Sequence, residues 1–128
     1  MAVQRIRTHK DLLVWQKAMD CAMEVFAVTK TFPATERFSL VDQVRRSSRS
    51  VPANISEAWR KRRYAAAFVS KLNDAEGEAA ETQTHLEIAR RCGYLAEEQA
   101  KHLDHQCEEI IAMLVSIANH PEQWTLSC

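Results

Sequence analysis

Glycine and proline are scarce in this chain, which contains 2 and 3 of them among its 128 residues. Strands and βαβ units need these residues, together with Asn and Asp, wherever the chain turns. Their scarcity therefore argues against all-β and α/β folds. Gly77 and Gly93 are separated by fifteen other residues, which excludes a glycine-rich loop that binds phosphate. The class that remains is an all-α domain.

A long hydrophobic run is also missing. The first apolar stretch, residues 12–28, is interrupted by Lys17, Asp20 and Glu24, which excludes a membrane-spanning segment. Residues 1–11 are polar and basic and do not have the apolar centre of a secretory signal. We therefore expect a cytoplasmic protein that does not enter a membrane.

The cysteines and histidines lack the spacing of a metal site or of a disulfide framework. The four cysteines stand at positions 21, 92, 107 and 128, with no CxxC pair. His102 and His105 are spaced as a metal-binding pair, but a structural zinc site needs four ligands and no second pair is present. Ser47, Ser48 and Ser50 have no neighbouring base that would activate a nucleophile. The sequence thus predicts no metal, no cofactor and no enzymatic activity.

Apolar residues are abundant and follow a helical period. They make up 46% of the chain, enough for the core of a single domain. Their three- and four-residue spacing predicts helices at about 11–31, 36–62, 65–92 and 97–118, followed by a tail over 119–128. Short connections between long helices predict an antiparallel up-down-up-down four-helix bundle. Pro52 lies inside the second helix and predicts a kink there, and Gly93 is expected to end the third helix as a left-handed cap.

The net charge is zero, but the charges are unevenly distributed. Residues 1–63 contain 13 basic and 6 acidic side chains, whereas residues 64–128 contain 4 basic and 11 acidic ones. Such a chain presents separate basic and acidic surfaces.

Six basic residues on the second helix and at its exit are the candidate binding residues. These are Arg45, Arg46, Arg49, Arg60, Lys61 and Arg63. At about 100° per residue, four of the arginines fall within a sector of about 60° and form a ridge. Guanidinium groups pair with phosphate, and the neighbouring Trp59 and Tyr64 are suited to stack on unpaired bases. Arg62 falls on the apolar side, which indicates that the helix ends near it.

Two interpretations of these arginines remain open. In the first, the protein is a non-enzymatic, oligomeric bundle that binds nucleic acid, structured RNA above all, with little sequence specificity, because phosphate contacts do not read bases. In the alternative, the arginines pair with acidic residues of the third and fourth helices, within the subunit or across a subunit interface. The protein is then an assembly or adaptor protein whose ligand is another protein.

Several motifs resemble one family. They are LLVWQKA at 12–18, FPxxExFxL at 32–40, QxxR at 43–46 and SVPxNIxE at 50–57. The chain is similar to the small bacterial four-helix-bundle proteins encoded by intervening sequences in 23S ribosomal RNA genes. These are similar in turn to the accessory variability determinant protein of diversity-generating retroelements. Weaker matches at Ala75, Gly77, Glu81 and Gly93-Tyr94-Leu95 extend the resemblance over nearly the whole chain.

The resemblance implies an assembly and a set of partners. It implies a homo-oligomer in the form of a cyclic pentamer and, from the retroelement relative, binding of nucleic acid (RNA or DNA) and of a reverse transcriptase. A ribosomal component is the other partner that it suggests. The chain departs from the family pattern at Ser56-Glu57-Ala58, where relatives have Ala-Glu-Gly, and at Gly77-Glu78, where they have Gly-Ser.

Overall fold

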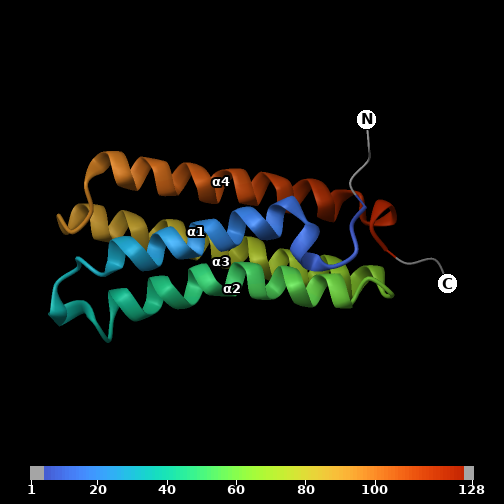
Figure 1. The fold of residues 1–128 in the computed structure, drawn as a ribbon, viewed down its shortest axis with the longest axis horizontal. Coiled ribbons are helices and arrows are strands. Elements are labelled where there is room, and N and C mark those ends of the chain that lie inside the picture. The colour runs from blue at the N-terminus through green and yellow to red at the C-terminus, as the bar shows by residue number, and fades with distance from the viewer. Residues whose placement is uncertain (1–4, 126–128) are drawn as a thin grey trace.

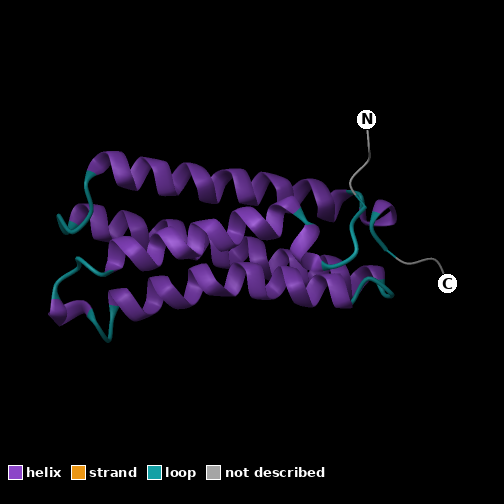
Figure 2. Cartoon of the chain, in the orientation of Figure 1, coloured by secondary structure: helices purple, strands orange, loops and turns teal. Residues whose placement is uncertain are grey.

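The computed structural model describes residues 5–125 and contains four long helices. They are α1 (Leu13–Thr29), α2 (Leu40–Arg60), α3 (Ala65–Arg91) and α4 (Glu97–Asn119). Short 3-10 turns, η1 (His9–Asp11), η2 (Ala34–Glu36) and η3 (Pro121–Gln123), flank them, and the described part of the chain has no strand. The helices lie side by side, and each runs back along the one before it (Figures 1 and 2). The predicted all-α four-helix bundle is confirmed.

The first two helices begin later than predicted because local side-chain bonds hold the preceding residues in 3-10 turns. Thr8 and Asp11 form a capping box around η1, and the extended backbone of Leu12 (φ −73°, ψ 126°) separates that turn from α1. Residue 36 is not the start of α2. Its carboxylate accepts hydrogen bonds from the Ser39 hydroxyl (2.6 Å) and the Leu40 backbone N–H (3.5 Å), so that Glu36 precedes the helix and caps it.

The Glu36 carboxylate also ties two distant connections together. Tyr94, which follows α3, donates its hydroxyl to the second carboxylate oxygen of Glu36 at 3.0 Å. The hydrogen bonds from Ser39 and Tyr94 lower the pKa of Glu36. Gly93 has φ 81° and ends the α3 segment, as predicted, with the Tyr94 N–H donating to the Ala89 carbonyl at 2.9 Å.

Helix α2 is continuous across Pro52, from Leu40 to Arg60. The Ser56 hydroxyl donates to the Pro52 carbonyl at 3.0 Å, and its oxygen accepts the indole N–H of Trp15 at 3.1 Å. This contact joins the first turn of α1 to the second half of α2. A kink at Pro52 stays a prediction.

The core lies along the shared axis of the helices. Its largest fully buried side chains include Ile55, Leu86, Leu103 and Leu114, contributed by α2, α3 and α4. Between α1 and α4 the thiols of Cys21 and Cys107 lie 3.9 Å apart. Both are buried among apolar side chains, and the neighbouring thiol together with burial raises the pKa of Cys107. These two cysteines therefore serve as small core residues.

One polar contact is buried in the α2–α3 packing. The hydroxyls of Ser47 and Thr82 lie 2.8 Å apart. Each is also within hydrogen-bond distance of a carbonyl of its own helix, that of Val44 for Ser47 (3.2 Å) and that of Glu78 for Thr82 (2.9 Å). Both residues are nearly inaccessible, at 2% and 1% exposure. The small size of these side chains thus lets the two helices approach closely, and the two buried hydroxyls satisfy each other's hydrogen-bonding capacity.

We predict that Ser47→Ala and Thr82→Val will each lower the free energy of unfolding by about 1 kcal/mol. The double variant should lose less than the sum, with a coupling of about 0.5–1 kcal/mol, because removing both hydroxyls leaves no unpaired polar group. Urea denaturation of the four proteins measures this coupling. Ser50→Ala, on the outer side of the same helix, is the control. Strictly additive losses would show that the two hydroxyls do not interact.

Candidate nucleic-acid interface

The six candidate residues lie in two separate places. Arg45, Arg46 and Arg49 are in the first half of α2, whereas Arg60 is its last residue. With a rise of about 1.5 Å per residue, Arg49 and Arg60 are about 16 Å apart along the helix. Lys61 and Arg63 follow the helix in its connection to α3, so helical spacing does not set the direction of Arg63. The ridge inferred from spacing is therefore two groups of cations.

The first group is partly engaged by α1. The guanidinium carbon of Arg45 lies 4.6 Å from the centre of the Phe26 ring, and that of Arg49 lies 5.8 Å from it. Arg45 also donates to the Thr29 hydroxyl at 2.8 Å and to the Phe26 carbonyl at 3.4 Å. These contacts hold the half-buried Arg45 in the α1–α2 packing, and cation–π attraction adds to them. Arg45 is thus a structural residue as well as a surface cation.

The second group surrounds a hollow of about 450 Å³ at the end of the bundle, lined by Trp59, Arg60, Lys61, Arg62, Arg63, Tyr64 and Ala67. Arg60, Lys61 and Arg63 are exposed. Arg62 stacks on the Trp59 indole, 3.4 Å from the ring centre, and donates to the Trp59 carbonyl at 2.8 Å. Helix α2 ends at Arg60 and Arg62 turns back onto it, as its apolar-side position indicated.

The two aromatic residues beside these cations differ in exposure. Trp59 is 7% exposed and is covered by Arg62, so it is not available to stack on a base. Tyr64 is 66% exposed. It precedes α3, whose first turn contains three alanines, no acidic residue and no side-chain cap. The start of α3 therefore presents free N–H groups rather than negative charge.

Three further cations lie at this end of the bundle. Arg5, Arg7 and Lys10 are exposed and belong to the segment that leads into α1. The η1 turn packs against α2, and Figure 1 shows this segment at the same end of the bundle as the α2–α3 connection. Sequence analysis missed these residues because they belong to no predicted helix. The predicted topology could have located them, since an up-down bundle places the start of its first helix beside the end of its second.

We call this surface the basic end and define it by seven residues: Arg5, Arg7, Lys10, Arg60, Lys61, Arg62 and Arg63. None of the ion pairs in residues 5–125 involves any of them. The nearby carboxylates are engaged elsewhere. Asp11 accepts the backbone N–H groups of Arg7 (2.8 Å) and Thr8 (3.1 Å), which lower its pKa, and Glu57 pairs with Lys71 at 2.7 Å.

Arg45, Arg46 and Arg49 likewise form no ion pair in the described part of the chain. Arg46 is close enough to Glu78 to attract it, but burial and the neighbouring Glu81 outweigh this and raise the pKa of Glu78. Pairing within the subunit therefore does not account for the arginines of α2.

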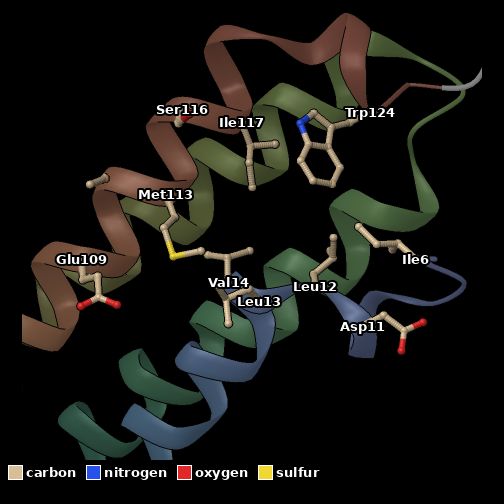
Figure 3. A pocket seen from close by; sticks show the side chains of 11 residues that line it. Ile6, Asp11, Leu12, Leu13, Val14, Glu109, Met113, Ser116, Ile117 and Trp124 are labelled. Carbon is tan, nitrogen blue, oxygen red and sulfur yellow. The ribbon is translucent and has the colours of Figure 1, made fainter. Parts of the chain in front are cut away.

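An apolar pocket of about 560 Å³ lies at the same end, between the start of α1 and the end of α4. Figure 3 shows Leu12, Ile117 and Trp124 around it, with the carboxylates of Asp11 and Glu109 at its edges. Glu109 is paired with Lys17, and Asp11 with backbone N–H groups. The pocket thus offers hydrocarbon surface and no free charge for a phosphate.

The histidine pair of α4 lies on another side of the bundle. His102 and His105 border a hollow of about 270 Å³ beside α1, where His102 Nε2 is 3.0 Å from a Glu24 carboxylate oxygen. Within residues 5–125, no three His, Cys, Asp or Glu side chains are grouped as metal ligands would be.

The model of the 23S rRNA-intervening sequence protein family matches residues 10–116 of this chain. The chain belongs to this family. A solved member of the S23 ribosomal protein family, a protein of unknown function from Bacteroides thetaiotaomicron, is 33% identical to it with a TM-score of 0.76. The match covers 83% of this chain and 98% of that one. No curated protein matches the chain.

The matched range includes α1 to α3 and nearly all of α4, so the intervening-sequence family shares the bundle itself. Arg5 and Arg7 lie before it, whereas Lys10 and the α2–α3 connection lie within it. No helix among the described residues is long and apolar enough to span a membrane.

We predict that Arg62→Ala will lower the free energy of unfolding by about 1–2 kcal/mol, because it removes both the stacking on Trp59 and the bond to its carbonyl. The neighbouring exposed Arg63→Ala is the matched control and should change it by less than about 0.5 kcal/mol. Chemical denaturation compares the two. If the Arg62→Ala and Arg63→Ala variants had the same free energy of unfolding, the Arg62–Trp59 contact would contribute nothing to the stability of the fold.

Proposed function

We propose that this protein is a non-enzymatic, cytoplasmic helical bundle that binds structured RNA through phosphate contacts at the basic end, with little sequence specificity. The observation that carries the proposal is the gathering, from two distant segments, of the six exposed cations of the basic end, which are all of its residues except the stacked Arg62; none of the six is in an ion pair of the described chain. Cations left unpaired in this way are available to replace the counterions of a phosphate backbone.

The geometry of the basic end supports phosphate as the ligand. Arg60, Lys61 and Arg63 are exposed around a hollow, and the uncapped start of α3 lies beside them. Guanidinium groups and helix N-termini both favour phosphate oxygens. Arg5, Arg7 and Lys10 extend the same surface. Phosphate contacts orient a nucleic acid without reading its bases, which is why we expect weak specificity.

The two groups of cations on and after α2 contribute unequally to RNA binding in this proposal. Arg60, Lys61 and Arg63 are assigned as the principal phosphate contacts. Arg45, Arg46 and Arg49 lie on the flank of the bundle, and two of them stack on Phe26. We assign this flanking group a lesser part in RNA binding.

Two triple variants with the same change in charge separate the groups. In Arg60→Ala/Lys61→Ala/Arg63→Ala we expect the affinity for a hairpin RNA to fall by at least about tenfold at moderate salt. The slope of log affinity against log salt on duplex DNA should become shallower by about 2.7, the value for three lost contacts. In Arg45→Ala/Arg46→Ala/Arg49→Ala both losses should be smaller. Fluorescence anisotropy at three salt concentrations measures affinity and slope.

Wild-type protein gives the reference. If four phosphate contacts form, its affinity falls about 10²-fold between 50 and 200 mM salt. Comparing hairpin RNA, duplex RNA and duplex DNA ranks the ligands, and thermal melting confirms that both triple variants are folded. Undiminished RNA binding by the basic-end variant would overturn the proposal.

A second function, self-assembly, is supported by the groove between α1 and α2. Met19, Ala22, Met23, Phe26, Arg49 and Pro52 line this hollow of about 270 Å³. Met23 is 57% exposed in it. Helix α4 carries complementary charge on the exposed Glu97, Glu98, Asp104 and Glu108. A head-to-tail contact between such unlike surfaces closes into a ring when the rotation from one subunit to the next divides a full turn evenly, and the family resemblance implies a ring of five.

We predict that wild-type protein sediments as a pentamer. The flanking variant Arg45→Ala/Arg46→Ala/Arg49→Ala should shift it toward monomer, because it removes the charge that faces the acidic helix. Sedimentation velocity at low and high salt measures the mass, and the basic-end variant serves as the equal-charge control that stays assembled. A monomeric wild type, or dissociation of both variants alike, would argue against this surface. Assembly without RNA binding would favour the adaptor function, with another protein as ligand.

A further inference from the structure

Tyr64, which lines the same hollow as Arg60, Lys61, Arg62 and Arg63 of the basic end, has a largely exposed aromatic ring. The side chain is 66% exposed, whereas Trp59 beside it is buried and covered by Arg62. The Tyr64 ring takes part in none of the aromatic pairs or cation–π contacts found within residues 5–125. An exposed ring without an intramolecular partner, placed among arginines, is available to a ligand.

The backbone of Tyr64 is held although its ring is free. Its N–H donates to the Lys61 carbonyl at 3.0 Å, and its carbonyl accepts the Phe68 N–H at 2.9 Å. Phe68 is itself a core residue at 3% exposure. The base of the side chain is therefore anchored to the bundle at the junction between the α2–α3 connection and α3. Binding a flat partner then requires little further ordering of the chain.

The neighbouring cations select the chemistry of that partner. Arg60, Lys61 and Arg63 lie within four residues of Tyr64 and share its hollow. A ring beside such cations suits a ligand that has both a flat apolar face and phosphates, which describes a nucleotide with an unpaired base. In a continuous duplex the base faces are covered by neighbouring pairs, so the ring has nothing to stack on there.

We infer that Tyr64 is a stacking platform for one unpaired base, so that the basic end takes RNA at a single-stranded loop flanked by a duplex. The inference rests on the proposed RNA-binding function and adds its ligand class. The three cations hold the phosphates on either side of the stacked nucleotide. Arg62 leaves the ring free because its own guanidinium is occupied by Trp59.

The test compares a hairpin RNA, with 2-aminopurine in its loop, against a blunt RNA duplex of the same number of nucleotides. Tyr64→Ala should weaken hairpin binding by about 5- to 150-fold, the range for loss of one stacked base, and leave duplex binding unchanged. Tyr64→Phe should bind both as wild type does, because stacking needs the ring and not the hydroxyl. Phe38→Ala is the matched control, since Phe38 is 89% exposed and precedes the start of α2, whereas Tyr64 follows the end of that helix.

A second measurement does not depend on any variant. Binding of wild-type protein should quench the 2-aminopurine fluorescence of the loop, because stacking on an aromatic ring changes the environment of that base. Unchanged fluorescence on saturation would overturn the inference even if Tyr64→Ala failed to fold. Thermal melting shows whether that variant is folded.

The remaining outcomes separate this inference from the function on which it rests. If wild-type protein binds neither RNA at low salt, the proposed function fails and the inference fails with it. If it binds both RNAs with a steep salt dependence and Tyr64→Ala matches it on each, the phosphate contacts stand and the stacking platform is overturned. If Tyr64→Ala keeps its affinity for both RNAs but sediments as a smaller assembly than wild type, Tyr64 belongs to a subunit contact instead.

Discussion

The packing of α2 against α3 is the contact on which the rest of the bundle depends. Ala75, Ala79 and Thr82 give α3 a buried side of small residues, and Ser47 meets it from α2. Small side chains allow the helix axes to approach closely, which fixes the rotation of α2 about its own axis. Because one side of α2 is fixed to the core, its cations have to lie on the other side. The position of the α2 cations on the surface thus follows from the way α2 packs against α3.

The order of the helices then decides which cations meet. Helix α2 ends beside the start of α1, where the η1 turn packs against it. Arg5, Arg7 and Lys10 consequently join Arg60–Arg63, although the two segments are far apart in sequence. On α3 and α4, Glu81, Glu87 and Glu97 form ion pairs within their own helices, with His85, with Arg90 and Arg91, and with Lys101. The uneven charge of the two halves of the chain is therefore preserved as a difference between surfaces.

Sequence patterns predicted the helices and their buried sides well, because apolar spacing records which side faces a core. They were less informative about the capping hydrogen bonds at the helix ends and about the side-chain contacts between neighbouring helices. The capping box of Thr8 and the cap made by Glu36 delay α1 and α2, since local hydrogen bonds compete with helix formation at these two starts. Helical angles placed Arg45 and Arg60 on one ridge, but they give no contacts: Phe26 of α1 engages Arg45, and only tertiary structure shows it. In the same way, Trp59 and Tyr64 look alike in sequence, and the backward turn of Arg62 onto Trp59 separates their exposures.

The separation of the two groups of cations has a consequence for assembly. In the head-to-tail assembly that we propose, contacts through the flank of α2 would leave the basic end of each subunit uncovered, because the two surfaces lie about 16 Å apart along one continuous helix. In a closed ring whose subunits stand with their long axes along the symmetry axis, the same end of every subunit faces the same side. In such a ring the basic ends would form one surface on which the phosphate contacts that we propose act together. Linked contacts of this kind raise overall affinity without any strong single site. Weak specificity in each subunit is thus compatible with firm binding of a folded RNA by the assembly.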